Sequence, residues 1–136
     1  MAFMEWTDKF SVGIAVFDDE HKKLIAILDA LHHAVASGTD KLELQRICDS
    51  MVEYAIGHFR HEEEYFEEWG FPDAAAHIAE HDALRKQVFD YRNQIRAADS
   101  SELAFQLLRF VRGWLSHHIL VEDKKYGRFL LQKGFN

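Results

Sequence analysis

The sequence predicts an all-α protein: an up-down-up-down four-helix bundle with an N-terminal arm and a short C-terminal helical segment. Its 136 residues include a single proline and only seven glycines, which is little material for the turns of an all-β fold. Apolar residues make up 48% of the chain, and in four long stretches they recur every three or four residues, the period of one helix face. Short breaks separate these stretches, and short connections favour antiparallel packing of successive helices. We therefore expect one domain over residues 1–136, with the arm at 1–17 and the bundle and C-terminal segment at 18–136.

Local signals mark the first two helices. Residues 1–17 are rich in aromatic side chains and lack a clear period, so we expect them to pack across the bundle as an arm. Asp18 can cap the first helix, and Gly38 can end it as a left-handed residue after the last turn. The segment 40–43 resembles a capping box. It opens a long second helix that Gly70 ends.

The third and fourth helices carry similar signals. Asp73 follows the turn at Pro72 and can cap the third helix, whose apolar seam is regular as far as Ile95. The segment 99–102 reads Asp-Ser-Ser-Glu, so we expect the fourth helix to start there. Residues from Tyr126 onward are interpreted as packing for the short terminal segment.

Five histidines and Glu62 occupy core positions on these seams, and Asp123 follows the last of them. Residues four apart project from nearly the same helix face, one turn along, so His58 with Glu62 and His77 with His81 each form a two-pronged pair of potential metal ligands. A buried polar group without a partner costs about 1–3 kcal/mol, so these positions need one. We predict seven metal ligands: His21, His58, Glu62, His77, His81, His118 and Asp123.

The predicted topology brings these seven residues together. In an up-down-up-down bundle, the start of the first helix and the end of the second lie at one end, with the start of the third and the end of the fourth. His21, the two pairs and His118 fall in those four places. One metal centre can satisfy all of them.

The spacing between His118 and Asp123 is the exception. Five residues on a regular α-helix correspond to a rotation of about 140°, so both side chains cannot point inward from an undistorted helix. A wide turn or a break between them removes the conflict, and such irregularities occur often at functional sites. We therefore expect one here.

The ligand inventory favours two ions over one. Five imidazoles, two bridging carboxylates and a bridging hydroxide fill all but one of the positions around two six-coordinate ions. The open position suits a small diatomic ligand. Nitrogen-rich ligation with carboxylate bridges favours iron or manganese over a closed four-ligand zinc site, and imidazole is a poor ligand for calcium or magnesium.

The remaining histidines and a run of glutamates are not assigned to the metal centre. The histidines lie off the seams and are expected at the surface or its boundary, without a ligand role: His32, His33, His61 and His117. The glutamates are interpreted as a solvated helix face: Glu63, Glu64, Glu67 and Glu68.

Composition and charge exclude several classes of partner. The net charge is −7, and the chain has no basic stripe, which argues against nucleic acid and against an anionic membrane. Cys48 is the single cysteine, so an internal disulfide is impossible and a reducing compartment is the simpler interpretation. No apolar run is long enough to span a bilayer, and the first residues do not read as a signal peptide. We expect a cytoplasmic monomer without membrane insertion.

The order of these motifs resembles the hemerythrin family, and most of all the single-domain bacteriohemerythrins, over essentially the whole chain. The matching elements are Asp18-Asp19-Glu20-His21, His58-Phe59-x-x-Glu62-Glu63, Gly70-Phe71-Pro72, His77 and His81 with Glu80 before the second, and Trp114-Leu115-x-x-His118-Ile119-x-x-x-Asp123-x-x-Tyr126. Phe71, where the family often has tyrosine, and Phe66, where methionine is frequent, depart from its pattern without touching a predicted ligand.

The resemblance implies a non-haem di-iron centre that binds dioxygen reversibly. The two irons, cycling between Fe²⁺ and Fe³⁺, would share a bridging hydroxide or oxide. By resemblance, His77, His81 and His118 would bind one iron, and His21 and His58 the other. Glu62 and Asp123 would bridge them.

The side chains near these ligands predict an apolar dioxygen pocket. Leu115 precedes His118 by three positions and so lies over the centre, one turn along. The other expected wall residues lie next to ligands or one turn from them. The predicted pocket comprises Leu115, Ile119, Phe59, Leu24 and Trp114.

Three functions remain open for such a centre. Dioxygen storage, delivery or transport, without enzymatic activity, is the first, with an oxygen-consuming protein as a possible acceptor. The second is an enzyme that activates dioxygen or peroxide, although di-iron oxidases use more glutamate ligands. The third is a dioxygen or redox sensor acting through a partner.

Overall fold

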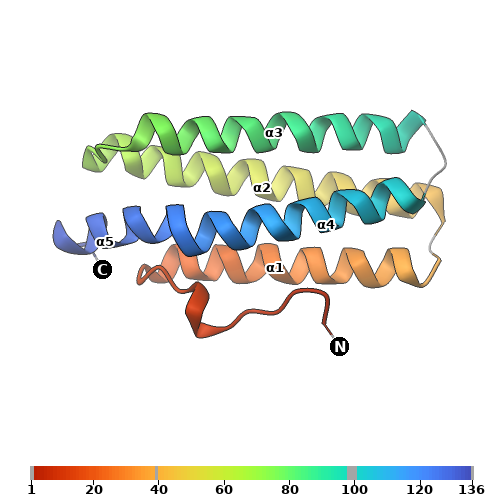
Figure 1. Ribbon diagram of the computed structural model, residues 1–136, viewed down its shortest axis with the longest axis horizontal. Coiled ribbons are helices and arrows are strands. Elements are labelled where there is room, and N and C mark those ends of the chain that lie inside the picture. Colours follow the sequence, from red (N-terminus) through yellow and green to blue (C-terminus); the bar gives the residue numbers. More distant parts are fainter. Residues whose placement is uncertain (1, 39, 98–100, 136) are drawn as a thin grey trace.

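The computed structural model describes residues 2–38, 40–97 and 101–135, and within those ranges the chain contains helices and loops but no β-strand. Four long helices run antiparallel along one axis (Figure 1). Each contacts two others, α1 packing on α2 and α4, and α3 packing on the same two. The predicted all-α four-helix bundle is confirmed. In chain order the elements are the 3₁₀-helix η1 (Asp8–Phe10), α1 (Ala15–Ala36), α2 (Lys41–Trp69), α3 (Ala74–Ala97), α4 (Ser101–His117), the π-helix η2 (His118–Asp123) and α5 (Lys124–Gln132).

Several predicted helix ends are confirmed by their geometry. The Asp40 side chain accepts a hydrogen bond from the backbone N–H of Glu43 at 2.9 Å, which caps α2. Gly38 and Gly70 have φ of 76° and 69°, a left-handed conformation that side chains with a Cβ rarely adopt. In the predicted start of the fourth helix, Asp99 and Ser100 lie outside the described residues, and α4 begins at Ser101.

The predicted cap of the first helix, Asp18, is wrong by four residues. α1 begins at Ala15, with Ile14 at the cap position and no side-chain cap bond. Ile14 is fully buried, so apolar packing positions this turn. Asp18 lies inside the first turn and binds the arm, accepting hydrogen bonds from the Val12 N–H at 2.8 Å and the Ser11 hydroxyl at 2.5 Å. The arm therefore ends at residue 14, not 17.

The arm runs along α1, as Figure 1 shows. Near its start, the Asp29 carboxylate of α1 accepts a hydrogen bond from the Phe3 N–H at 2.7 Å. Farther along, the arm packs on α5, where a Cβ added to Gly127 would lie 2.3 Å from the Val12 carbonyl oxygen. Only glycine permits this approach. The arm thus covers the end of the bundle where α1 begins.

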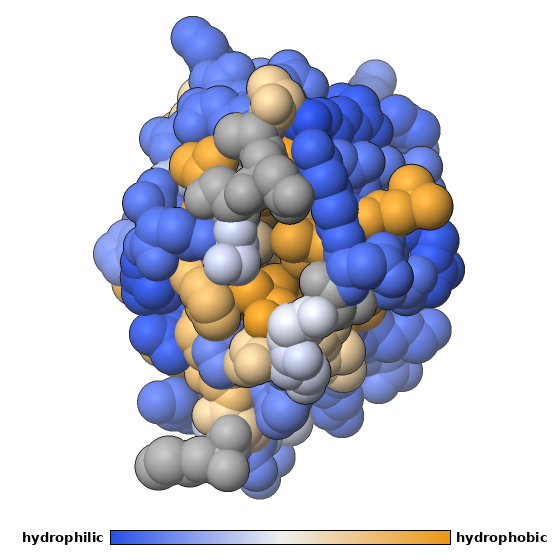
Figure 2. Space-filling model, turned by 90° about the vertical axis from the view of Figure 1, so that its right-hand side faces the viewer, coloured by the Kyte–Doolittle hydropathy of each residue, from blue (hydrophilic) through white to orange (hydrophobic). Residues whose placement is uncertain are grey.

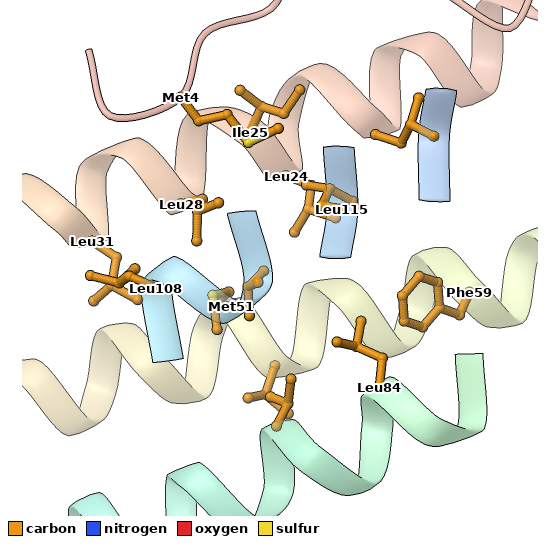
Figure 3. Packing of buried hydrophobic residues seen from close by; sticks show 14 of the residues in the cluster. Met4, Leu24, Ile25, Leu28, Leu31, Met51, Phe59, Leu84, Leu108 and Leu115 are labelled. Carbon is orange, nitrogen blue, oxygen red and sulfur yellow. The ribbon is translucent and has the colours of Figure 1, made fainter. Parts of the chain in front are cut away.

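Apolar side chains from all four helices fill the bundle interior (Figure 3). At the end where α1 stops and α2 starts, apolar residues also reach the surface among hydrophilic ones (Figure 2). Leu42, in the first turn of α2, is 77% exposed there. Within the described parts of the chain, no helix has the length and apolar character needed to cross a membrane.

Candidate metal centre

The seven predicted ligands converge at the other end of the bundle. They come from α1, α2, α3 and η2, and each is at most 4% exposed. The structure therefore brings together every side chain that the sequence pattern singled out.

These side chains form two overlapping groups. Glu62, Asp123 and three histidines make up one, and His21, His58 and Glu62 the other. In each group the potential ligand atoms all lie within 4.8 Å of one another. The histidines of the first group are His77, His81 and His118. Glu62 belongs to both groups, so its carboxylate lies between them.

Asp123 also faces both sets of histidines. Its Oδ1 lies 2.9 Å from Nε2 of His77 and 3.0 Å from Nε2 of His118. Its Oδ2 lies 3.2 Å from Nε2 of His21, in the other group. Glu62 makes the equivalent approach from α2, with Oε1 3.3 Å from Nε2 of His58 and 3.4 Å from Nε2 of the His81 ring. Two carboxylates thus lie between the two sets of imidazoles, as bridging ligands would.

The π-helix η2 makes this position of Asp123 possible. It spans His118–Asp123, and π-helical hydrogen bonds join residues five apart. Its wider turn brings His118 and Asp123 to the same side. The predicted irregularity between these residues is confirmed.

Several buried polar atoms in the cluster lack a hydrogen bond to any other described residue. They are both ring nitrogens of His21, Nε2 of His77, Oε1 of Glu62 and both carboxylate oxygens of Asp123. The Nε2 atoms of His81 and His118 lie 3.1 Å apart, so two ring nitrogens point at one place. Such an arrangement is costly without a bound cation, because several of these buried polar atoms make no hydrogen bond. Imidazole nitrogens and carboxylate oxygens directed at shared points fit transition-metal ions.

The pKa values of the clustered side chains also fit a cation-binding site. Burial lowers the pKa of His21, but the Asp123 and Glu62 carboxylates outweigh it and raise this pKa to about 10. His81 behaves alike, with a pKa raised to about 9 by Glu62 and Glu63 against the effect of burial. Burial raises the pKa of both Glu62 and Asp123, yet the surrounding imidazoles bring each well below its usual range. Without metal, protons on the imidazoles balance two buried carboxylates, and a metal cation would displace them.

A second set of glutamates supports the histidines from outside, and the sequence analysis missed it. Glu20 of α1 binds Nδ1 of His58 on α2 at 2.7 Å. Glu63 of α2 binds Nδ1 of His81 on α3 at 2.7 Å. Glu80 of α3 lies 3.3 Å from Nδ1 of His118, the first residue of η2. An ionised carboxylate only accepts, so each Nδ1 donates and each Nε2 is left free for a metal.

Two interpretations from the sequence are therefore corrected. Glu63 is not part of a solvated face: it is half-buried and also accepts from Arg85 at 2.8 Å. Tyr126 does more than pack, because its fully buried hydroxyl donates to Oε2 of Glu62. The available signal was position, since each supporting glutamate directly adjoins a predicted ligand in the sequence.

The histidines not assigned to the centre lie outside both groups. Of these, His61 has a defined contact, with Nδ1 2.6 Å from the Glu20 carboxylate. Next to His58 and His61 the surface has an open hollow of about 350 Å³, lined also by Glu20 and Tyr54.

The residues of the predicted apolar wall are buried or half-buried, and two of them contact candidate ligands. Leu24, Phe59, Leu115 and Ile119 are at most 2% exposed, and Trp114 is half-buried. The Phe59 ring stacks on His81 with centroids 4.0 Å apart, and the Trp114 ring stacks on His118 at 4.3 Å. Figure 3 shows Leu24 and Leu115 beside each other between α1 and α4.

Comparison with known proteins decides the family. The family model described as the hemerythrin HHE cation binding domain matches residues 12–130. The chain belongs to the hemerythrin family. It is 36% identical to the bacteriohemerythrin of Methylococcus capsulatus, over 93% of this chain and 96% of that protein. It is 32% identical to the bacteriohemerythrin of Clostridium acetobutylicum, over 89% and 96%.

The fold agrees with this assignment. A crystal structure of wild-type hemerythrin matches with a TM-score of 0.85 and 34% sequence identity, over 93% of this chain and 97% of that one. The buried cluster described above is therefore a candidate for the hemerythrin-type metal site of this chain.

Proposed function

We propose that this protein binds dioxygen reversibly at a non-haem di-iron centre, for storage, delivery or transport, and that it is not an enzyme. The observation that carries the proposal is the position of Glu62 and Asp123 between two unequal sets of histidines. Three imidazoles on one side and two on the other leave one ion with fewer protein ligands, and so with a place for a small molecule.

The proposed roles of the seven residues follow their grouping. His77, His81 and His118 would hold one iron, and His21 and His58 the other. Glu62 and Asp123 would bridge the pair, with a hydroxide or oxide as the further bridge. The glutamates on the outer nitrogens would hold each ring in the tautomer that directs Nε2 inward.

When bound, the two irons supply the electrons that dioxygen binding requires. The protein's contribution is an enclosed and mostly apolar site. Leu24, Leu115 and Ile119 would exclude water from the ligand, which favours release of dioxygen over its reduction. Tyr126 would hold the Glu62 carboxylate in place through its hydroxyl.

The ligand set supports a carrier over an oxidase. Five of the seven proposed ligands are neutral imidazoles. With only two carboxylates, the centre has less negative charge to stabilise the strongly oxidised iron that oxygen-activating chemistry needs. Di-iron oxidases in bundles of this kind use several glutamates for that purpose.

The test is reversible oxygenation. The anaerobic ferrous protein is exposed to dioxygen, purged with inert gas and exposed again, while its visible spectrum is recorded. A carrier regains the same spectrum in each cycle, whereas the zinc-loaded protein, as control, shows no change. Oxidation in the first cycle without recovery on purging would contradict the proposal.

A further inference from the structure

A small cavity lies between α2 and α3, separate from the cluster of metal ligands. It measures about 20 Å³. Its buried side is formed by Phe59, Leu84 and Val88, and its outer side by the half-buried Ala55, Arg85 and Phe89. Figure 3 shows Phe59 of α2 and Leu84 of α3 side by side at this place.

The cavity suits an apolar gas. No polar atom contributes to its exposed wall, so a water molecule inside it would lack the hydrogen-bond partners it needs. Its volume accommodates about one small molecule. Dioxygen and xenon are small, uncharged and apolar, and belong to the class of ligand that such a cavity holds.

The inner wall of the cavity is shared with the metal centre. Phe59 lines the cavity, and its ring stacks on His81 with centroids 4.0 Å apart and an interplanar angle of 13°. The same ring meets the Trp114 ring edge-on at 5.7 Å. Rotation of the Phe59 side chain would therefore connect the cavity with the apolar wall of the centre.

The charged side chain of Arg85 forms part of the outer wall and is fixed by hydrogen bonds. The Arg85 guanidinium lies 5.5 Å from the centre of the Phe59 ring, within the range of a cation–π contact. It donates to Glu63 of α2 at 2.8 Å and to Asp82 at 2.5 Å. Arg85 thus lines the outer side of the cavity and joins α3 to α2.

We propose that this cavity is the access chamber through which dioxygen reaches and leaves the metal centre. Rotation of the Phe59 side chain would open it towards the centre, and the Arg85 side chain would restrict its opening to solvent. The proposal rests on the function proposed above. If the cavity controls passage, narrowing it changes the association and dissociation rate constants of dioxygen by the same factor, because neither the free nor the bound state is altered. The affinity stays constant.

The first test is occupancy by xenon in crystals of the iron-loaded protein under gas pressure. We expect xenon in the cavity of the parent and none after Ala55→Phe, which fills the space. Ala34→Phe, at a half-buried alanine of α1, is the matched control and keeps the xenon. Absence of xenon from the parent cavity overturns the chamber, whether or not the iron centre binds dioxygen reversibly.

The second test is the rate of dioxygen binding and release in the same variants, by stopped-flow mixing. Ala55→Phe should slow both rate constants by about one decade at unchanged affinity, and Ala34→Phe should change neither. Ala55→Leu fills less of the space and gives an intermediate effect, which covers the case of a poorly folded phenylalanine variant. Rates equal to the parent in a variant without xenon overturn the chamber while the proposed function stands.

Replacement of Arg85 should have the opposite effect on the rate constants of dioxygen binding and release. Arg85→Met should speed both rate constants. The test of constant affinity stays with Ala55→Phe, because Arg85 also donates to Glu63, the partner of His81. Arg96→Met is the control, because Arg96 also joins α3 to α2, binding Asp49 at 2.9 Å, without lining the cavity. A protein that never binds dioxygen reversibly is recognised by its spectrum alone, and that result refutes the proposed function and the chamber with it.

Discussion

His118 and Asp123 lie five residues apart, yet Nε2 of the histidine is 3.0 Å from Oδ1 of the aspartate. The π-helix η2 brings them together. One wide turn thereby directs the Asp123 carboxylate to the point where the histidines of α1 and α3 also converge.

Loss of Asp123 should remove metal from the centre. We expect two irons per chain in the parent and one or none in Asp123→Ala, because a bridging carboxylate contributes to both ions. The measurement is metal analysis of the purified, iron-reconstituted protein. Glu122→Ala is the control, since Glu122 is the neighbouring carboxylate and pairs with Lys125 at 3.3 Å. Two irons retained in Asp123→Ala would show that this residue is not a bridge.

Leu115→Ala should speed autoxidation of the oxygenated protein while the iron content stays intact. The truncation opens space beside the centre and admits solvent. Leu107→Ala, at a fully buried leucine two turns earlier in α4, should cost a similar amount of stability, about 2–5 kcal/mol, without changing autoxidation. The decay of the oxygenated spectrum measures the rate. If both variants decay like the parent, Leu115 does not guard the site.

Tyr126→Phe should destabilise the metal centre while the aromatic ring continues to fill the core. The substitution leaves Oε2 of Glu62 without its hydroxyl donor, which costs about 1–3 kcal/mol for a buried group. We expect faster release of iron to a chelator and a lower free energy of unfolding. Tyr65→Phe, at a half-buried tyrosine of α2 that packs on Phe17 with ring centroids 5.0 Å apart, is the control. Equal iron release from both variants would argue against a role for the Tyr126 hydroxyl.

Metal uptake should strengthen as the pH rises. The pKa values of His21 and His81 are raised to about 10 and about 9 in the metal-free protein, so both rings hold protons at neutral pH. Metal binding must displace these protons, and the apparent affinity therefore increases as the pH approaches 9. Anaerobic calorimetry of ferrous binding in buffers of different ionisation enthalpy measures the proton release. Uptake that is independent of pH, with no proton release, would contradict this prediction.

Six of the seven candidate ligands could be predicted from the sequence because each occupies a core seam of its own helix, and Asp123 is the exception. Helical periodicity is a local property, so the pairs His58 with Glu62 and His77 with His81 are visible in the chain itself. The irregular turn before Asp123 followed in the same way, from a spacing that a regular helix cannot satisfy.

The supporting residues depended on the tertiary structure. Glu20, Glu63 and Glu80 each lie beside a ligand in sequence, yet each binds a histidine on the following long helix or its π-helical extension. Which neighbour a flanking side chain reaches depends on the rotation and separation of two packed helices, and neither quantity is encoded in local periodicity. The start of α1 was decided in the same way, since burial of Ile14 in the assembled core outweighed the capping signal of Asp18.

The sequence by itself thus determined the fold class and the end of the bundle where the seven candidate ligands gather. Only the tertiary structure decided which glutamate holds which histidine, that Tyr126 binds Glu62, and that a cavity lies between α2 and α3. The physical reason is that helical periodicity arises within single helices, whereas hydrogen bonds between helices and cavities arise from how the helices pack.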